Sequence, residues 1–594
     1  MDLLAGFNRT GYCAELSSAD IGKTVGICGW VQRRRNLGSL LFIDLRDRTG
    51  IVQLAFDDNT DREVFDKANS VRSEYVLAVS GTVRERSSKN SELATGDIEI
   101  EVTEVRILGK SETPPFEIVE NCPTAETQRL KHRYLDLRRP DLQKNILLRN
   151  KVMKITRDYF YDNGFIEIET PILIRSTPEG ARDFLVPSRL HQGNFYALPQ
   201  SPQLYKQLSM VAGFDKYIQL ARCFRDEDSR ADRQPEFTQI DLEMSFVDVE
   251  DVLKVVEGYI STVFEGAIGA KIPTPLPRLT YNDAMERFGS DKPDTRFGME
   301  LYNISDIAEK CGFSVFSEAV RSGGSVRAIT AKNAVAKLSR KEIDKLTDFV
   351  KGSGAKGLAW IRLTEDGMAS SFGKFMTEDE MQAILERGDA QKGDVVLIIA
   401  DSKKSRALTI LGLLRCEVAR RLDIIPEGFN FLWITEFPFF DWDEDLQQYV
   451  AMHHAFTAPM DECVEYLESD KGRVKAKCYD LVLNGIELSS GSIRITDPEL
   501  QSRIFKLLGL SDEEAYAKFG YLLDAFKYGP PPHGGMGIGL DRLIMQMVSV
   551  DSLRDVIPFP KLKDATEAMT SCPGEVDASQ LEELGLSIVS AEKE

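Results

Sequence analysis

Two apolar runs joined by a polar loop constrain the fold of this 594-residue chain more than any other feature. Residues 217–224 and 237–246 both have the composition of strands, and a loop rich in Arg and Asp connects them. This pattern predicts an antiparallel hairpin with a long loop. Arg225 is then expected at a strand end, with Glu227 on the same face and Phe237 on the return strand. A guanidinium in this position can clamp a phosphate, and a ring can stack on a purine.

A glycine-rich segment further along the chain precedes a predicted helix. Glycines at 534, 535, 537 and 539 let the backbone approach a ligand closely, and the helix is expected to begin near Leu540. Arg542 then lies in its first turn. Each feature has an ordinary alternative, because charged hairpin loops are usually solvated and glycine-rich turns usually cap a helix or allow tight packing.

Together, the two segments resemble motifs 2 and 3 of the class II aminoacyl-tRNA synthetases. The resemblance implies that Arg225 binds the α-phosphate of ATP and the amino acid carboxylate, and that Glu227 reads the adenine amino group. It also implies that Phe237 stacks on the base and that Arg542 covers its other side near the γ-phosphate. Arg225 and Arg542 are therefore the expected catalytic residues. The other expected ATP contacts are Asp226, Gln234, Glu487, Gly539, Leu540 and Asp541.

Length and composition limit the class of protein. A chain of 594 residues is too long for one hydrophobic core, so three or four domains are expected. The net charge of −20 provides no global basic field, and any RNA contact must come from local patches. Nine cysteines without a CxxC pair, and only five histidines, argue against a zinc site or a disulfide framework. With no signal-peptide pattern and no apolar run near the ~20 residues of a membrane span, we expect a cytoplasmic protein without membrane contact.

Residues 24–108 contain five β-rich runs, with a polar helix at about 61–71 after the third, which predicts an OB-fold barrel. Such barrels bind single-stranded nucleic acid on the face of strands 2 and 3. For a barrel taken alone, a solvated arginine turn and a core phenylalanine are equally good interpretations. Joined to a class II domain, it resembles the anticodon-binding domain of the aspartate, asparagine and lysine enzymes. The resemblance implies that Arg35, Phe42 and Gln53 contact anticodon bases of the tRNA.

The remaining segments follow from local patterns. The basic string RLKHRYLDLRR suits a hinge with phosphate-facing cations. A predicted helix at about 141–163 and the strand ending at Pro171 resemble class II motif 1, which implies a homodimer. The expected fold class is multidomain α+β, with an N-terminal β OB-fold barrel, an antiparallel-sheet catalytic domain of class II type and an inserted α+β domain like that of bacterial-type aspartyl enzymes. The expected boundaries are 1–108 for the barrel, 109–140 for the hinge, 141–292 and 416–560 for the catalytic domain, 293–415 for the insertion and 561–594 for a C-terminal extension.

An unusual set of charges accompanies the ATP motifs. Gln203 and Lys206 are three residues apart on a predicted helix and share a face, although a lone helical lysine is nearly always solvated. Arg494 and Asp241 lie on predicted strands. We expect Lys206 and Arg494 to bind the side-chain carboxylate of the substrate. We expect Asp241 and Gln203 to bind the ammonium group of the same substrate. The aspartyl enzymes use residues that match Lys206 and Arg494 for this task.

The same resemblance adds residues that the pattern alone does not identify. It implies that Glu179 closes over the aspartate and that His453 lies near it. Asp480 and Glu487 match acids that bind Mg²⁺ on the ATP phosphates, although two carboxylates alone are a weak signal. The SSGS sequence after Glu487 replaces a usually glycine-rich stretch, and we expect it to narrow the floor of the site.

The expected function is attachment of L-aspartate to tRNA(Asp) through an aspartyl-adenylate made from ATP. An asparaginyl or lysyl enzyme is less favoured, because an asparagine site does not need Lys206. A non-discriminating enzyme that also charges tRNA(Asn) stays open, and Leu37 weighs only slightly against it. A non-catalytic tRNA-binding paralogue is disfavoured because the phosphate arginines and both acids are present.

Overall fold

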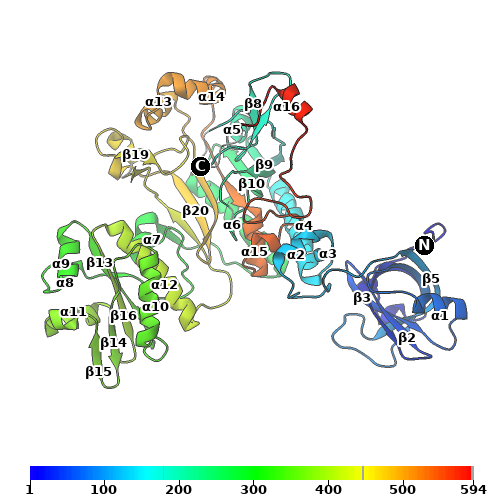
Figure 1. Cartoon of the computed structure of the whole chain (residues 1–594). Helices are drawn as coiled ribbons and strands as arrows, with labels where there is room; N and C mark the ends of the chain where they lie inside the picture. The colour runs from blue at the N-terminus through cyan, green and yellow to red at the C-terminus, as the bar shows by residue number, and fades with distance from the viewer. Residues whose placement is uncertain (178–179, 229, 444–446, 590–594) are drawn as a thin grey trace. The chain divides into compact units, whose positions relative to one another are not determined.

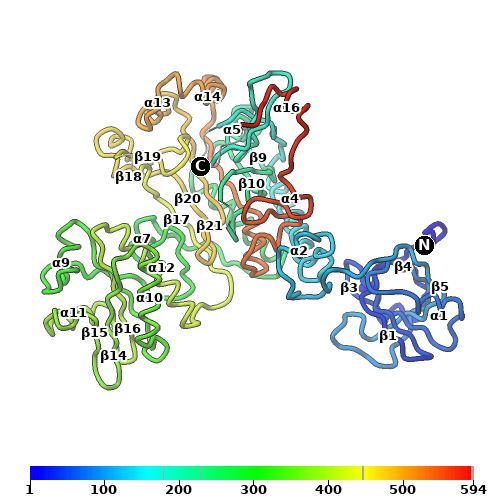
Figure 2. The backbone as a smooth tube through the Cα atoms, viewed as in Figure 1, coloured from blue at the N-terminus to red at the C-terminus, as the bar shows by residue number. Residues whose placement is uncertain are grey.

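The structure is a computed structural model that describes residues 1–177, 180–228, 230–443 and 447–589 (Figure 2). The chain separates into two compact units, each built from pieces that are distant in sequence. The first unit comprises Met1–Asn150, Asp228–Gln234 and Val550–Val576, and the second comprises Lys151–Glu227, Pro235–Ser549 and Asp577–Glu594.

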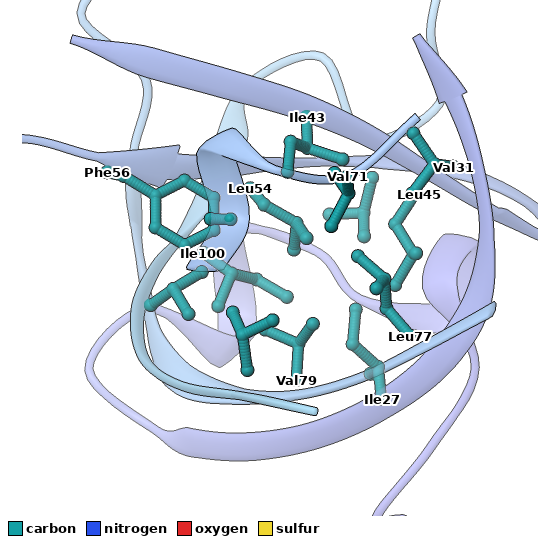
Figure 3. Close-up of a cluster of buried hydrophobic side chains, with 14 of the residues drawn as sticks. Ile27, Val31, Ile43, Leu45, Leu54, Phe56, Val71, Leu77, Val79 and Ile100 are labelled. Carbon is teal, nitrogen blue, oxygen red and sulfur yellow. The ribbon is translucent and has the colours of Figure 1, made fainter. Parts of the chain in front are cut away.

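The first unit begins with a closed five-stranded barrel. Its strands, in spatial order, are β1 (Thr24–Asn36), β2 (Leu41–Asp47), β3 (Gly50–Phe56), β5 (Ile98–Gly109) and β4 (Val76–Glu85), and α1 (Arg62–Asn69) follows β3. Alternate side chains point inward, where Ile27, Leu45, Leu54, Val79 and Ile100 are completely buried (Figure 3). The predicted OB-fold barrel is therefore confirmed.

Short helices follow the barrel in the first unit. They are α2 (Glu126–Lys131), α3 (Arg133–Asp136) and the beginning of α4 (Pro140–Asp162). Asp136 is completely buried and accepts hydrogen bonds from Arg133 at 2.6 Å and from Arg139 at 2.9 Å. The expectation that this basic string faces phosphate is wrong for these two arginines, because a buried carboxylate requires cationic partners inside the protein.

The second unit is built on an eight-stranded, mostly antiparallel sheet. In spatial order its strands are β11 (Arg278–Thr280), β17 (Phe431–Thr435), β20 (Cys478–Leu483), β21 (Ile486–Ile493), β22 (His533–Gly539), β10 (Glu236–Ser245), β9 (Lys216–Phe224) and β6 (Ile166–Glu167). The predicted hairpin is β9–β10, in which Phe224 pairs with Glu236. The glycine-rich segment is a central strand, β22, paired with both β10 and β21. A Cβ at Gly535 would lie 2.1 Å from Leu242 O, so close backbone approach explains this glycine.

Helices and small hairpins surround this sheet. The helices are α5 (Gln203–Val211), α6 (Val249–Ile268), α13 (Pro498–Leu507), α14 (Asp512–Phe526), α15 (Leu540–Val548) and α16 (Ala578–Leu584). The two-stranded sheets pair β7 (Leu185–Pro187) with β8 (Phe195–Ala197) and β18 (Phe440–Asp443) with β19 (Gln448–Ala451). Helix α15 begins at Leu540, as the sequence predicts. In the described part of the chain, no helix is long and apolar enough to cross a membrane.

The inserted segment forms its own sheet with helices on both faces. Its strands, in spatial order, are β12 (Tyr302–Asn303), β13 (Ser325–Ala331), β16 (Val395–Asp401), β14 (Ala359–Thr364) and β15 (Gly367–Ser370). The helices here are α7 (Tyr281–Phe288), α8 (Ser305–Ala308), α9 (Ser314–Arg321), α10 (Arg340–Gly352), α11 (Glu378–Arg387) and α12 (Lys404–Leu422). Helices α10 and α12 pack on one face of the sheet, and α8, α9 and α11 pack on the other (Figure 1). Helix α12 continues past residue 415 because Val418 and Leu422 belong to the same buried cluster.

Candidate active site

A pocket of about 370 Å³ is lined by residues from several elements of the second unit. Five residues that the sequence analysis selected line it, although they are distant in sequence: Gln203, Lys206, Arg225, Asp241 and His453. The other lining residues are Ser201, Gln239, Met452, His454, Thr457, Cys478, Ser490, Gly491, Ser492 and Gly537. The pocket therefore contains most of the predicted aspartate-binding set.

Helix α5 places a lysine inside the protein. Lys206 is only 2% exposed, unlike an ordinary helical lysine. Its Nζ lies 3.1 Å from Asp241 Oδ1 and 3.4 Å from Glu243 Oε2. Asp241 and Glu243 are two residues apart on β10 and therefore share a face. The lysine is buried at an acceptable cost because two carboxylates balance its charge.

Glu243 is a buried acid beside the pocket that the sequence analysis missed. It is completely buried and accepts a bidentate pair of hydrogen bonds from Arg494: Nε donates to Oε1 at 2.9 Å, and Nη2 donates to Oε2 at 3.0 Å. Burial acts to raise the pKa of Glu243, but Arg494 and Lys206 outweigh it and lower the pKa to about 2. Glu243 is therefore ionised and orients both cations. Its position two residues after Asp241 was the available signal.

Two polar groups in the pocket have spare hydrogen-bonding capacity. Asp241 Oδ2 and Gln203 Nε2 are buried, and neither has a hydrogen-bond partner among the described residues. Burial raises the pKa of Asp241, although Lys206 opposes this shift. A carboxylate acceptor beside an amide donor can bind a substrate that carries both an ammonium and a carboxylate.

Two consecutive histidines lie beside these groups. Burial lowers the pKa of His453 to about 4, and its Nε2 lies 3.2 Å from Cys478 Sγ. Burial also raises the pKa of Cys478, so this thiol is not an activated nucleophile. His454 was not selected from the sequence, yet its Nε2 accepts from Arg494 Nη1 at 2.7 Å. Both imidazoles are therefore neutral near pH 7.

The predicted nucleotide residues lie around the β9–β10 loop and the start of α15. The Arg225 guanidinium lies 5.1 Å from the centre of the Phe237 ring, and Arg225 N donates to Pro235 O at 2.8 Å. Arg542 Nη1 donates to Glu487 O at 3.1 Å, which connects α15 to β21. Asp541 Oδ2 accepts a hydrogen bond from Thr238 N at 2.8 Å, and this bond connects the start of α15 to β10. Phe237, Glu487 and Arg542 do not line the 370 Å³ pocket, whereas Arg225 does.

Asp480 and Glu487 form an acidic pair on β20 and β21. Burial and then the charge of Glu487 raise the pKa of Asp480 well above its ordinary value. Asp480 Oδ1 is buried without a hydrogen-bond partner in the described part of the chain. These observations fit Mg²⁺, which takes one or two protein carboxylates and keeps several waters. No group of three or more His, Cys, Asp and Glu residues able to hold a metal is found in residues 1–177, 180–228, 230–443 and 447–589.

Two further predictions concern the floor of the site and the residue expected to close over it. Ser490 lines the pocket, whereas Ser489 is buried against Met536. Glu179 lies outside the described residues.

On the barrel, the structure brings the three predicted anticodon residues together. Arg35 donates to Gln53 Oε1 at 2.9 Å and lies 5.8 Å from the centre of the Phe42 ring. The sequence analysis missed two partners of Gln53: Arg86 donates to its Oε1 at 2.9 Å, and Glu99 accepts from its Nε2 at 2.8 Å. The side-chain amide of Gln53 is therefore held in one orientation.

Comparison with known proteins agrees with this arrangement. A family model described as tRNA synthetases class II (D, K and N) matches residues 125–563, and one for an OB-fold nucleic acid binding domain matches residues 25–108. The chain is 60% identical, over 98% of both chains, to the aspartate–tRNA ligase of Ruminiclostridium cellulolyticum. It is 54% identical, again over 98% of both chains, to the aspartate–tRNA(Asp/Asn) ligase of Lachnoclostridium phytofermentans.

Solved structures show the same fold at lower identity. The asparaginyl-tRNA synthetase from Pyrococcus horikoshii, complexed with asparaginyl-adenylate, has a TM-score of 0.58 and 20% identity, with 93% of this chain and 97% of that chain covered. The aspartyl tRNA synthetase from Entamoeba histolytica has a TM-score of 0.57 and 20% identity, with 94% and 92% covered.

Proposed function

Because this chain belongs to the class II tRNA synthetases of the D, K and N group, we propose that it attaches L-aspartate to tRNA(Asp) at the expense of ATP. It is an aspartate–tRNA ligase that forms AMP. The observation that carries this choice of amino acid is a buried pair of cations: Lys206 lines the pocket, and Arg494 lies behind it, bonded to the lining residues His454 and Ser492. Asparagine in place of aspartate would offer these cations a neutral amide instead of a carboxylate, and a hydrogen bond to a charged group contributes about 1.5–3 kcal/mol.

The aspartate is held at both ends. Lys206 and Arg494 bind its side-chain carboxylate, while Asp241 and Gln203, whose free polar atoms face the same pocket, bind its ammonium. His453 lies beside the amino acid, and His454 orients Arg494. Glu179 is proposed, from the resemblance alone, to close over the substrate.

Adenylate formation requires positioning and charge stabilisation. An oxygen of the aspartate α-carboxylate attacks the α-phosphorus in line, and the bond to the β-phosphate oxygen breaks to release pyrophosphate. Arg225 neutralises the charge that develops on the α-phosphate. Asp226, Glu227, Phe237, Gly539 and Leu540 complete the nucleotide site, with Asp541 and Arg542 at the start of α15. Gln234 is a further proposed contact of the nucleotide: its Nε2 donates to Lys561 O and its Oε1 accepts from Lys561 N, which leaves one N–H and one oxygen lone pair of the amide for ATP.

Asp480 and Glu487 would hold Mg²⁺, which supplies positive charge for the ATP phosphates when bound. In the second step, the 3′-terminal hydroxyl of the tRNA attacks the carbonyl carbon of the adenylate, and AMP leaves. Arg35, Phe42 and Gln53 on the barrel provide the anticodon contacts. The proposed compartment is the cytoplasm, which suits the nine free thiols.

A homodimer is supported by exposed apolar side chains near the predicted motif 1. Tyr161, Ile166, Ile172 and Leu173 are all exposed at the end of α4 and in the segment after it. Such clustering is typical of an isologous contact surface. Sedimentation of Ile172→Asp against the unmodified protein tests this proposal: the variant should sediment as a monomer, and an unchanged dimer would place the contact elsewhere.

Charging assays with purified tRNA(Asp) and tRNA(Asn) test the function directly. We expect aspartate-dependent exchange of pyrophosphate into ATP and charging of tRNA(Asp). Charging of tRNA(Asn) as well would establish the broader activity that the name of the Lachnoclostridium relative describes. Exchange that is absent, or that asparagine or lysine drives better, would refute the proposal.

A further inference from the structure

A buried carboxylate on the barrel accepts hydrogen bonds from two arginines of different segments. Glu74 is 4% exposed, and its two oxygens accept from Arg46 Nη2 at 2.9 Å and 2.8 Å. Arg138 donates from Nη1 to Glu74 Oε2 at 2.8 Å. Arg46 lies on β2, whereas Arg138 follows α3 in the predicted hinge, residues 109–140. Within the first unit, Glu74 therefore connects the barrel to the hinge.

The backbone of Glu74 is held on β1. Its φ of 63° lies in the left-handed region, which residues with a side chain rarely adopt. Two hydrogen bonds to Val31 fix this conformation: Glu74 N donates to Val31 O at 2.7 Å, and Val31 N donates to Tyr75 O at 2.9 Å. Neither bond involves the carboxylate, so Glu74→Gln retains both.

Strand β1 makes two further contacts with the hinge. The Arg138 guanidinium lies 5.0 Å from the centre of the Trp30 ring. Gln32 Nε2 donates to Ile118 O at 3.0 Å, and Gln32 Oε1 accepts from Arg46 Nη1. The register of β1 against β2 is irregular at Gln32, and such a bulge re-aims a side chain. The contact between barrel and hinge is thus polar and centred on Arg46 and Glu74.

The same two strands carry proposed anticodon contacts. Phe42 and Arg46 are four residues apart on β2 and share its outward face, since residues 41, 43 and 45 are completely buried in the core. Arg35 is paired with Phe42, and Trp30 is paired with Arg46. The anticodon contacts and the hinge contacts therefore lie towards opposite ends of one pair of strands. Groups on paired strands are placed more precisely than groups on loops.

We propose that Glu74 is a positioning residue for the charging of tRNA, and that it acts through Arg138. One tRNA has to reach the barrel with its anticodon and the active site with its 3′ end. Binding at two connected places is favoured when the connection limits their relative freedom. The salt bridge between Glu74 and Arg138 limits the freedom between barrel and hinge. This inference rests on the proposed function, including the anticodon contacts of the barrel.

The test compares Glu74→Gln, Arg138→Gln and the double variant in the full-length protein. In charging assays with purified tRNA(Asp), each single variant should raise the KM for tRNA about tenfold. In aspartate-dependent pyrophosphate exchange without tRNA, kcat and the KM for ATP should stay within about twofold of the unmodified protein. The double variant should match the single variants, because both substitutions break the same contact.

The direction of the change in KM separates positioning from charge. Glu74→Gln removes one negative charge, so electrostatics alone would lower the KM for a polyanionic tRNA. Glu117→Gln is the matched control, because it removes the same charge from an exposed position of the hinge and should not raise the KM. The slope of log KM against log salt should be unchanged in Glu74→Gln, since no contact with phosphate is lost.

Other outcomes overturn the inference. A normal or lowered KM for tRNA in Glu74→Gln would mean that the salt bridge only stabilises the fold, and a parallel loss of pyrophosphate exchange would mean a general structural defect. A raised KM in Arg138→Gln alone, with a salt slope reduced by about one, would mean that Arg138 binds a phosphate directly.

Arg138→Gln decides the question if Glu74→Gln fails to fold by circular dichroism, because it leaves the pair of Arg46 and Glu74 in place. A raised KM for tRNA with an unchanged salt slope would then support positioning, and a reduced slope would overturn it. Absence of pyrophosphate exchange in the unmodified protein would instead refute the proposed function.

Discussion

At the residue scale, we propose that the choice of amino acid depends on the two buried cations. Lys206→Ala or Arg494→Ala removes one partner of the substrate carboxylate, and we expect aspartate activation to fall by two or more orders of magnitude, because a broken buried pair costs ~3–5 kcal/mol. ATP binding should survive, since neither side chain belongs to the proposed nucleotide site. Pyrophosphate exchange at varied aspartate, with ATP binding measured by calorimetry, checks this. Near-normal turnover in either variant would refute the pocket.

Glu243 gives a second prediction, because it balances both cations. Glu243→Gln leaves Lys206 paired with Asp241 and removes the described salt bridge of Arg494, so we expect a loss of about 3 kcal/mol in unfolding free energy. Saturating aspartate should stabilise the variant more than the unmodified protein, because the substrate supplies the missing charge. Melting curves with and without aspartate measure both effects. Glu309→Gln, at an exposed position, is the control, and equal ligand shifts would contradict this role.

His453 predicts a pH dependence of stability. Its pKa in the folded protein, about 4, lies below the ordinary value of 6.5, so the unfolded chain binds more protons between these two pH values. Stability should therefore fall as the pH drops from 6.5 towards 4, and this contribution should be constant above 6.5. His453→Gln should lose less melting temperature between pH 7 and pH 5 than the unmodified protein. His191→Gln, at an exposed histidine, should keep the original dependence.

At the element scale, strand β22 depends on glycine for close packing. A Cβ at Gly535 would lie 2.1 Å from Leu242 O and 2.3 Å from Glu243 Oε2, so Gly535→Ala must displace β10 together with the Glu243 side chain. We expect a large loss of both stability and exchange activity. At Gly539 the nearest atom is 3.6 Å away, so Gly539→Ala should retain the fold. Soluble yield and melting temperature of the pair compare the two sites, and equal behaviour would contradict the packing argument.

Local patterns predicted the elements, but not their long-range partners. The β9–β10 hairpin and the start of α15 follow from hydrophobic runs and glycines that are close in sequence. Glu243 was missed because its ion pair is with Arg494, a residue about 250 positions away. A glutamate on a strand has no local signature that would reveal such a partner. The hydrogen bonds between Gln234 and Lys561 were missed for the same reason. The buried Arg133 was also unpredictable, because three of its acceptors are backbone carbonyls, which the sequence does not distinguish.

At the scale of the whole molecule, the N-terminal barrel has a complete core of its own. Because a closed barrel leaves no free strand edges, we expect the fragment 1–109 to fold alone. Circular dichroism and a cooperative melting curve would show this. Leu54→Ala, in the centre of that core, should destabilise the fragment by ~2–5 kcal/mol. A fragment that shows no cooperative transition would mean that the barrel needs the rest of the chain.

The acids on β10 also pair the two buried cations when no amino acid is bound. Lys206 is paired with Asp241 and Glu243, and Arg494 with Glu243, in the absence of substrate, so neither cation has to recruit chloride or sulfate from the surrounding solution. Common buffer anions should therefore compete poorly with the amino acid. Without substrate, the two cations therefore stay paired with acids of the protein.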